Sequence, residues 1–381
     1  MYDFSDVRAF LESLGTYGIP MSGLEVRHHH KVVFHEYFGY ADTEKTKKPD
    51  DSTLVWLYSV SKVVTCIAAM RLVEEGKLSP DDKLSKYLPE FEHMKVRTKD
   101  GVRDAENPIL IKHLFTMSSG FSYDPSENMM KLIKEKKDAS TLEITRSLAD
   151  FPLFFEPGTD YRYGFSHDLL AAVIEVVSGM TLGEYMRKIM FDPLEIENMG
   201  FHPSENDTAR FAAQYKYDIG TYTSKPCPPG TPLNMGGLEL PRTVEFGSGG
   251  LYSNLQGVSK IMDTVACGGT SENGYRLLRP ETVALMEENR LPTRALKTLH
   301  YDARLHGYGW GYCGRVHMNP ELSFSNSPKG EFGWDGAAAS YVMIDRKNEI
   351  AISYITHVFD CHYIWQKGEE RIRDLVYDAI K

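Results

Sequence analysis

The sequence predicts a mixed α/β fold, in which a sheet built from both ends of the chain flanks a mainly helical insertion. Two observations support this fold. Apolar runs of strand length occur near both termini, at residues 21–27, 31–37, 308–316, 337–344 and 349–356. Between these runs, helical periodicity and long loops dominate from about residue 78 to residue 240. We therefore expect one α/β domain from residues 1–77 and 241–381, an inserted helical domain from residues 78–240, and an active site at their interface.

Helices are expected wherever apolar residues recur at a spacing of three to four. The segments with this pattern are residues 4–14, 60–76, 111–117, 126–136, 140–150, 168–178, 181–190, 255–267 and 368–380. His28-His29-His30 lies between the first two strands. Because neighbouring side chains in a strand or turn point in different directions, a polar hairpin connection is favoured over a metal site there.

Composition and charge argue against several classes of function. The net charge is −10 with scattered acids, whereas a nucleic-acid-binding protein should carry a basic face. The five cysteines include no Cys-x-x-Cys pair, which argues against a zinc or redox site, and no cofactor or metal is predicted. No apolar run reaches membrane-spanning length and the N-terminus lacks a signal pattern, so a cytoplasmic location is favoured unless a signal peptide has been removed. The oligomeric state is left open.

Ser59-Val60-Ser61-Lys62 is the one Ser-x-x-Lys motif in the chain. It opens a helical stretch, so a spacing of three places the serine hydroxyl and the lysine amine on one face. A lysine in a water-poor pocket has a lowered pKa and can help to deprotonate a serine. The alternative is an ordinary helix start with Ser59 as the cap and a solvated Lys62.

Two further segments support the catalytic interpretation. Pro157-Gly-Thr-Asp-Tyr-Arg-Tyr163 precedes an apolar helix, and a tyrosine beside a lysine ammonium can ionise below its ordinary pKa and act as a base. Gly333-Trp334-Asp335-Gly336-Ala337 leads into an apolar strand, where a glycine lets substrate approach and the Ala337 N–H can face it. Taken singly, each segment could equally consist of packing aromatics or a turn.

In this order, the three motifs resemble those of the serine β-lactamase and penicillin-binding protein superfamily, in its class C β-lactamase-like branch. Residues 72–89, Ile111 to Gly120 and Gly247-Ser-Gly-Gly250 are also similar to segments of that family, and the resemblance covers about residues 20 to 360. It implies a β-lactamase/transpeptidase-like α/β (α+β) fold, with an antiparallel sheet flanked by helices and a large inserted helical domain.

The resemblance also implies the role of each site residue. Ser59 would be the acylated nucleophile, Lys62 its proton-relay partner and Tyr163 the general base. The N–H groups of Ser59 and Ala337 would form the oxyanion hole, each donor being worth about 3–4 kcal/mol in the transition state.

Departures from the family pattern favour esters as substrates. Phe165 stands where these β-lactamases carry Asn, and Trp334-Asp335-Gly336 stands where they carry Lys-Thr-Gly. Without that lysine, no cation is expected for the carboxylate of a β-lactam or a D-Ala-D-Ala peptide. These residues look instead like those of the family VIII carboxylesterases and related acyltransferases, so Phe165, Trp334, Asp335 and Gly336 are the predicted substrate-binding residues.

The leading hypothesis is thus a serine hydrolase, a carboxylesterase, acting on a small-molecule ester. One alternative is a D-Ala-D-Ala-type peptidase, amidase, penicillin-binding protein or weak class C-like β-lactamase acting on an amide or peptide. Another is a non-catalytic scaffold that kept the fold. Three roles stay open: His167 could contact substrate or lie on the surface, Asp168 could cap a helix, and Asp335 could select a cationic substrate or bond the backbone.

Overall fold

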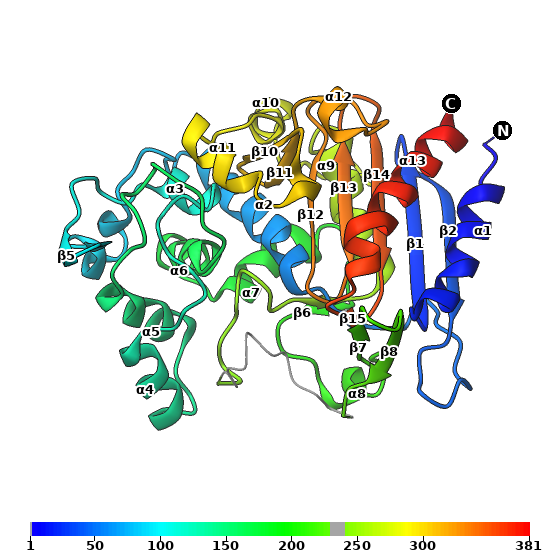
Figure 1. The fold of residues 1–381 in the computed structure, drawn as a ribbon, viewed down its shortest axis with the longest axis horizontal. Coiled ribbons are helices and arrows are strands. Elements are labelled where there is room, and N and C mark those ends of the chain that lie inside the picture. The colour runs from blue at the N-terminus through cyan, green and yellow to red at the C-terminus, as the bar shows by residue number, and fades with distance from the viewer. Residues whose placement is uncertain (1, 229–240) are drawn as a thin grey trace.

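The computed structural model describes residues 2–228 and 241–381, and its centre is an antiparallel sheet of seven strands (Figure 1). The spatial order is β10-β11-β12-β13-β14-β1-β2. The strand bounds are β1 (Met21–His28), β2 (Lys31–Gly39), β10 (Tyr308–Gly311), β11 (Gly314–His317), β12 (Phe332–Asp335), β13 (Tyr341–Asp345) and β14 (Ile350–Ile355). Because β1 pairs with both β2 and β14, the two ends of the chain share one sheet, as predicted.

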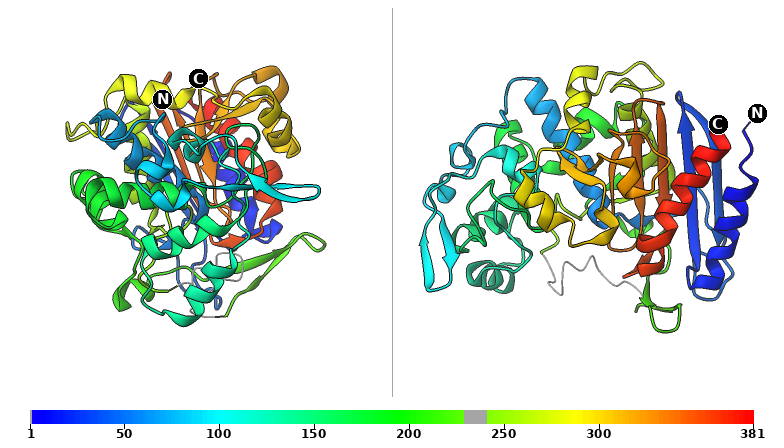
Figure 2. Two further views of the ribbon diagram at one scale, coloured as in Figure 1. Left: turned by 90° about the vertical axis from the view of Figure 1, so that its left-hand side faces the viewer. Right: turned by 45° about the horizontal axis from the view of Figure 1, so that its top comes forward.

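Helices cover both faces of this sheet. The helix α1 (Ser5–Ser13) and the C-terminal helix α13 (Glu369–Ile380) lie side by side on one face, and Figure 2 shows them together. The opposite face carries α9 (Leu255–Ala266), which packs on β14, β1 and β13. Successive residues of β13 accordingly enter different cores, since side chains in a strand alternate between faces. The nearly continuous burial of β13 and β14 follows from this double cover.

The middle of the chain is mainly helical and lies to one side of the sheet in Figure 1. The helix α2 (Ser61–Glu74) joins the two regions, because it packs against α6 (Ser166–Ser178). The other helices of this region are α3 (Ile111–Phe115), α4 (Glu127–Glu135), α5 (Thr141–Arg146), α7 (Leu182–Met186) and α8 (Glu205–Thr208). The predicted domain boundaries remain a prediction, and the one after residue 240 adjoins residues outside those described.

Short elements complete the fold. The remaining strands are β3 (Val55–Trp56), β4 (Lys95–Thr98), β5 (Gly101–Asp104), β6 (Met199–Gly200), β7 (Tyr215–Asp218), β8 (Thr223–Pro226), β9 (Tyr252–Ser253) and β15 (Val358–Phe359). The remaining helices are α10 (Pro280–Ala284), α11 (Thr293–Leu299) and α12 (Pro320–Ser323).

Two strand predictions near the C-terminus need correction. The run 308–316 is a hairpin of β10 and β11, not one strand. Gly314 has φ +120° and lies so close to β12 that a Cβ there would be 2.5 Å from the Gly333 carbonyl oxygen. The run 337–344 begins with a turn, in which Ala339 has φ +64° and the Gly336 N–H bonds the Ser340 carbonyl at 2.7 Å. The Trp334 motif therefore ends β12 and does not open β13.

The histidine triplet forms a hairpin connection, as favoured from the sequence. His28 ends β1, and His29 and His30 make the two-residue turn to β2. Both turn residues have positive φ, 51° and 65°, which is the geometry of the tight turns that connect twisted strands.

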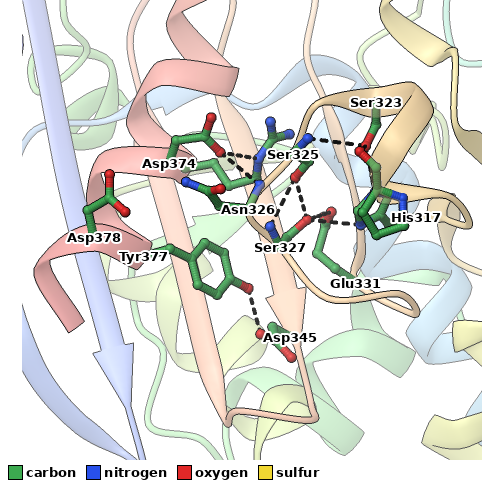
Figure 3. Close-up of polar contacts among 12 residues, drawn as sticks. His317, Ser323, Ser325, Asn326, Ser327, Glu331, Asp345, Asp374, Tyr377 and Asp378 are labelled. Atoms are coloured by element: carbon green, nitrogen blue, oxygen red, sulfur yellow. Dashed lines mark hydrogen bonds and ion pairs between the residues drawn. The ribbon is translucent and has the colours of Figure 1, made fainter. Parts of the chain in front are cut away.

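A mostly buried polar cluster lies beside α13 (Figure 3). We call it the His317 network: His317, Ser323, Ser325, Ser327 and Glu331. His317 Nε2 lies 2.6 Å from Ser323 Oγ, and Ser327 Oγ lies 2.7 Å from Ser325 Oγ and 3.2 Å from Glu331 Oε2. The following loop meets α13, where Asp374 accepts the Asn326 N–H at 3.2 Å. These bonds tie β11, α12, β12 and α13 into one unit.

Within the described residues, no single helix is long and apolar enough to cross a membrane. One pair, α6 with the segment Leu182–Phe191, passes that test jointly but is bent by 72°.

Candidate active site

Ser59 lies in a turn of 3-10 helix, Tyr58–Val60, between β3 and α2. The strand β3 ends at Trp56, and Tyr58 takes the left-handed conformation with φ +48°. Such a conformation is unfavourable for a tyrosine and persists only where surrounding contacts impose it. Gln214 Nε2 donates to the Tyr58 hydroxyl at 2.6 Å, and the Tyr58 ring packs edge-on against Phe359. The turn leaves Ser59 half-buried at the start of α2.

Lys62 is one helical turn further on and is almost fully buried, with 1% of its surface exposed. Its Nζ donates to Ser59 Oγ at 2.9 Å and to the Ser248 carbonyl oxygen at 2.7 Å. Burial disfavours the ammonium form and lowers the pKa of Lys62 to about 7, although the nearby Asp168 carboxylate acts in the opposite direction. The predicted Ser59–Lys62 contact is therefore present, and a substantial part of the amine is in its neutral, basic form near neutral pH.

Asp168 connects α6 to the glycine-rich segment that contains Ser248. Its Oδ1 accepts the Ser248 N–H at 3.0 Å, so the side chain positions the carbonyl that binds Lys62 and does not cap the helix. Burial raises the pKa of Asp168 to about 6, and the positive charge of Lys62 opposes this rise. Lys62 and Asp168 thus titrate as interacting buried groups.

Tyr163 stands over the lysine. Its ring centroid is 4.5 Å from Lys62 Nζ, and its hydroxyl accepts a hydrogen bond from Trp334 Nε1 at 2.8 Å. Burial raises the pKa of Tyr163, while hydrogen bonds from Ser59 and Trp334 act in the opposite direction. The lowered tyrosine pKa expected from a neighbouring lysine is not found, because the effect of burial outweighs that of the hydrogen bonds.

Aromatic rings form the wall around this centre. Trp334 and Trp310 meet edge to face with their centroids 4.5 Å apart, and Tyr163 and Tyr161 pack against Trp310. Tyr123 packs edge-on against Tyr163, and its ring centroid is 5.4 Å from Lys62 Nζ. The site is thus lined by apolar surface with a few polar tips.

Two backbone N–H groups of the described residues, those of Ser59 and Ala337, have no backbone hydrogen-bond acceptor. Ser59 lies in the first turn of its helix, where N–H groups have no intrahelical acceptor. Ala337 follows Gly336, whose Cα packs so closely on this turn that a Cβ would be 2.4 Å from the Leu57 carbonyl oxygen and 3.5 Å from Ser59 N. Among the described residues, no acceptor bonds the Ala337 N–H. Glycine at position 336 is therefore what brings the Ala337 segment beside Ser59.

Asp335 lies next to this segment but faces a cation of the protein. Its Oδ2 is 3.1 Å from Arg304 Nη1, and Arg304 also contacts Asp302 at 2.8 Å. Only 13% of the Asp335 side chain is exposed. The structure thus adds an internal ion pair to the two roles considered from the sequence.

Two other candidates lie beneath the site. Phe165 is 2% exposed and packs edge-on against Tyr123, so it supports the wall from behind. His167 is fully buried, with Nε2 3.0 Å from the Phe115 carbonyl oxygen, and burial lowers its pKa to about 3. His167 therefore does not lie on the surface, and its buried contact with the Phe115 carbonyl oxygen indicates a structural role.

Sequence reasoning missed four contributors: Tyr123, Ser248, Trp310 and Arg304. Ser248 lies in Gly247-Ser-Gly-Gly250, which was noted only as a similarity, and Tyr123 lies just beyond the similar segment that ends at Gly120. Trp310 stood in a glycine-bearing run with the pattern of a sheet strand. No local signal marked Arg304, because its partner Asp335 is 31 residues away.

Comparison with known proteins agrees with this geometry. The family model described as Beta-lactamase matches residues 7–374. Esterase EstB of Burkholderia gladioli is 26% identical over 360 residues, which cover 87% of this chain and 84% of that protein. Lovastatin esterase of Penicillium rubens is 30% identical over 349 residues, covering 83% and 84%.

A solved structure agrees over nearly the whole chain. EstCE1, described as a hydrolase with promiscuous acyltransferase activity, superposes with a TM-score of 0.79 at 27% identity and covers 97% of both chains. The chain therefore shares its fold with that hydrolase over 97% of its length.

Proposed function

Because this chain belongs to the beta-lactamase family, we propose that it is a serine hydrolase that forms an acyl-enzyme at Ser59, with carboxylic esters as substrates. One observation carries the proposal: Ser59 Oγ is held 2.9 Å from a buried lysine amine whose pKa is about 7. A neutral amine at that distance can accept the serine proton as the hydroxyl attacks.

In the first step, Ser59 Oγ bonds to the ester carbonyl carbon and its proton passes to Lys62 Nζ. The carbonyl oxygen becomes an oxyanion, which the Ser59 and Ala337 N–H groups bind. Donors of this kind contribute about 3–4 kcal/mol each, because they are oriented before the charge develops. The Ser248 carbonyl oxygen and the Asp168 carboxylate stabilise the ammonium that forms.

In the second step, the bond to the leaving alkoxide breaks and the alkoxide takes a proton. The general-base role of Tyr163 stays a prediction. Since burial raises its pKa, we assign Lys62 as the first proton acceptor. The neutral Tyr163 hydroxyl then gives its proton to the alkoxide and is reprotonated by the Lys62 ammonium. Water repeats the sequence in reverse and releases the acid.

The lining of the site supports esters over β-lactams and peptides. The third motif offers an indole, and the neighbouring Arg304 is already paired with Asp302 and Asp335. Among the described residues of the third motif and its neighbour Arg304, a substrate carboxylate would therefore meet no unpaired cation. The names of the relatives agree: two are esterases and the third is a hydrolase with promiscuous acyltransferase activity. That last description supports acyl transfer to an alcohol as a second candidate, with the same acyl-enzyme.

The test is hydrolysis of p-nitrophenyl butyrate, combined with intact-protein mass spectrometry after brief exposure to the ester. We expect steady turnover and an adduct of one butyryl group, both absent in Ser59→Ala. Ser323→Ala is the matched control, because Ser323 also has a base at hydrogen-bond distance, and it should retain wild-type turnover. Turnover or a butyryl adduct in Ser59→Ala would refute the assignment. Labelling by a fluorescent penicillin faster than by the ester would refute the preference for esters.

A further inference from the structure

The turn of the β1–β2 hairpin lies against the last turn of α9, and three metal-ligand side chains meet there. His30 Nδ1 is 2.8 Å from Asp263 Oδ2, and Cys267 Sγ is 3.8 Å from Asp263 Oδ1. One ligand atom from each of these residues lies within 4.8 Å of the other two. We propose that His30, Asp263 and Cys267 bind a zinc-type divalent cation.

The donor set suits such an ion. An imidazole nitrogen, a carboxylate oxygen and a thiolate sulfur are the ligands that Zn²⁺ and its probe Co²⁺ accept in tetrahedral sites. Three protein ligands leave the fourth position for a water molecule. On binding, the Cys267 thiol loses its proton to solvent, and His30 presents the Nδ1 lone pair with its proton on Nε2. The carboxylate and thiolate then neutralise the two positive charges.

The surroundings favour a cation at this place. Asp263 and Cys267 are at the C-terminal end of α9, where the helix dipole is negative. The Asp263 side chain is 2% exposed, and among the described residues its carboxylate has one ion-pair contact, with the half-buried His30. Arg27 lies nearby, but its guanidinium is bonded to Glu25 at 2.6 Å and faces Glu272 at 3.8 Å.

The proposed site is open to solvent, and its three ligands have a suitable spacing in the fold. The His30 side chain is 29% exposed and Cys267 is half-buried, so an ion can enter from solvent. Asp263 and Cys267 are four residues apart on one helical face, and His30 comes from a turn 233 residues earlier. Of the histidine triplet, His30 is thus the one residue for which we propose a metal-binding role, and its partners Asp263 and Cys267 are brought to it by the fold. A bound ion would join the hairpin to α9 and stabilise the folded state, since the unfolded chain lacks the site.

The test uses the full-length protein with Co²⁺ as the probe. We expect a near-ultraviolet thiolate-to-cobalt charge-transfer band and tetrahedral visible bands on titration, and their displacement by Zn²⁺. Cys267→Ser should remove the charge-transfer band, and both Cys267→Ser and His30→Gln should weaken Zn²⁺ binding by at least about tenfold. Cys227→Ser and His29→Gln are the matched controls, because they change another partly exposed cysteine and the neighbouring histidine that pairs with Glu349.

Two outcomes would overturn the proposal. In the first, wild-type protein shows no charge-transfer band at millimolar Co²⁺, which would leave His30 and Asp263 as a hydrogen-bonded pair only. In the second, Cys267→Ser keeps the band while Cys227→Ser loses it, which would place the thiolate elsewhere. The wild-type titration decides the first outcome even if a variant folds poorly.

Discussion

Ser59 and Ser323 each place a hydroxyl beside a basic nitrogen, Ser59 at 2.9 Å from Lys62 Nζ and Ser323 at 2.6 Å from His317 Nε2. By distance to the base alone, Ser323 would be the better candidate nucleophile. The His317 Nδ1 even lies 3.0 Å from the Pro328 carbonyl oxygen, which sets the tautomer that a base requires.

The two serines differ in whether the backbone N–H groups around them are already hydrogen-bonded. At Ser323, the N–H groups are already used: its own bonds the Asn319 carbonyl oxygen at 3.1 Å, and the Ser325 N–H bonds Ser323 Oγ at 3.3 Å. At Ser59, neither its own N–H nor the Ala337 N–H has a backbone acceptor among the described residues, and Gly336 packs against the Ser59 turn. Free N–H donors beside the hydroxyl therefore distinguish Ser59, the proposed nucleophile, from Ser323, whereas the serine–base distance does not.

The largest expected effect tests the lysine side of the comparison. Lys62→Met keeps the length and apolar stem but removes the proton acceptor, so kcat for p-nitrophenyl butyrate should fall by about 1,000-fold. His317→Gln is the matched change at the other pair and should leave kcat within about twofold. Steady-state kinetics of both purified variants decides the matter. Equal losses in the two variants would contradict the distinction.

The next effect is on pH dependence. Lys62 must be neutral to accept the proton, and its pKa is about 7, so kcat/KM should rise about tenfold per pH unit below 7 and level above it. The measurement is a profile of kcat/KM in buffers of constant ionic strength. If kcat/KM instead rose near the ordinary pKa of a lysine, burial would not lower the pKa of Lys62.

A smaller effect is expected from the indole hydrogen bond. Trp334→Phe removes the Nε1–H that donates to the Tyr163 hydroxyl but keeps most of the ring. Losing one hydrogen bond of this kind should lower kcat by about 3- to 10-fold with little change in KM. Trp365→Phe, which removes an indole N–H bonded to the Gly336 carbonyl oxygen, is the control for a general loss of packing near the motif. A change confined to KM would make Trp334 a binding residue only.

Asp168→Asn should move the acidic limb rather than abolish activity. The asparagine can still accept the Ser248 N–H, but it lacks the negative charge that raises the Lys62 pKa. The limb of the kcat/KM profile should therefore shift below pH 7, with the plateau within about threefold of wild type. A shift to higher pH would reverse the assigned sign of this coupling.

The smallest effect concerns Ser323. Ser323→Ala removes the contact with His317 inside the network, which should cost about 1 kcal/mol of unfolding free energy and lower Tm by about 2 °C. Its kcat should not change. Differential scanning calorimetry beside the esterase assay measures both quantities, and a fall in kcat at constant Tm would restore Ser323 as a functional residue.

Local patterns were sufficient wherever the decisive contact is close in sequence. The Ser59–Lys62 contact follows from one helical turn, and the hairpin of β1 and β2 follows from two apolar runs with a short polar connection. Tyr163 and Ala337 were placed at the site by family resemblance, and the structure brings both beside Ser59. Patterns failed where a backbone conformation depends on a neighbour, as at the turn before Ser340 and the Gly314 turn between β10 and β11.

The sequence by itself determined the family, the helix that carries Ser59 and Lys62, and an aromatic third motif without a lysine, because these depend on residue identity and short spacing. Only the tertiary structure decided the proton affinities and the partners. The Lys62 pKa depends on burial and on Asp168 more than a hundred residues away, and Asp335 is paired with Arg304 from another loop. Electrostatic energies depend on distance in space and on exclusion of water, and the order of the residues alone gives neither quantity.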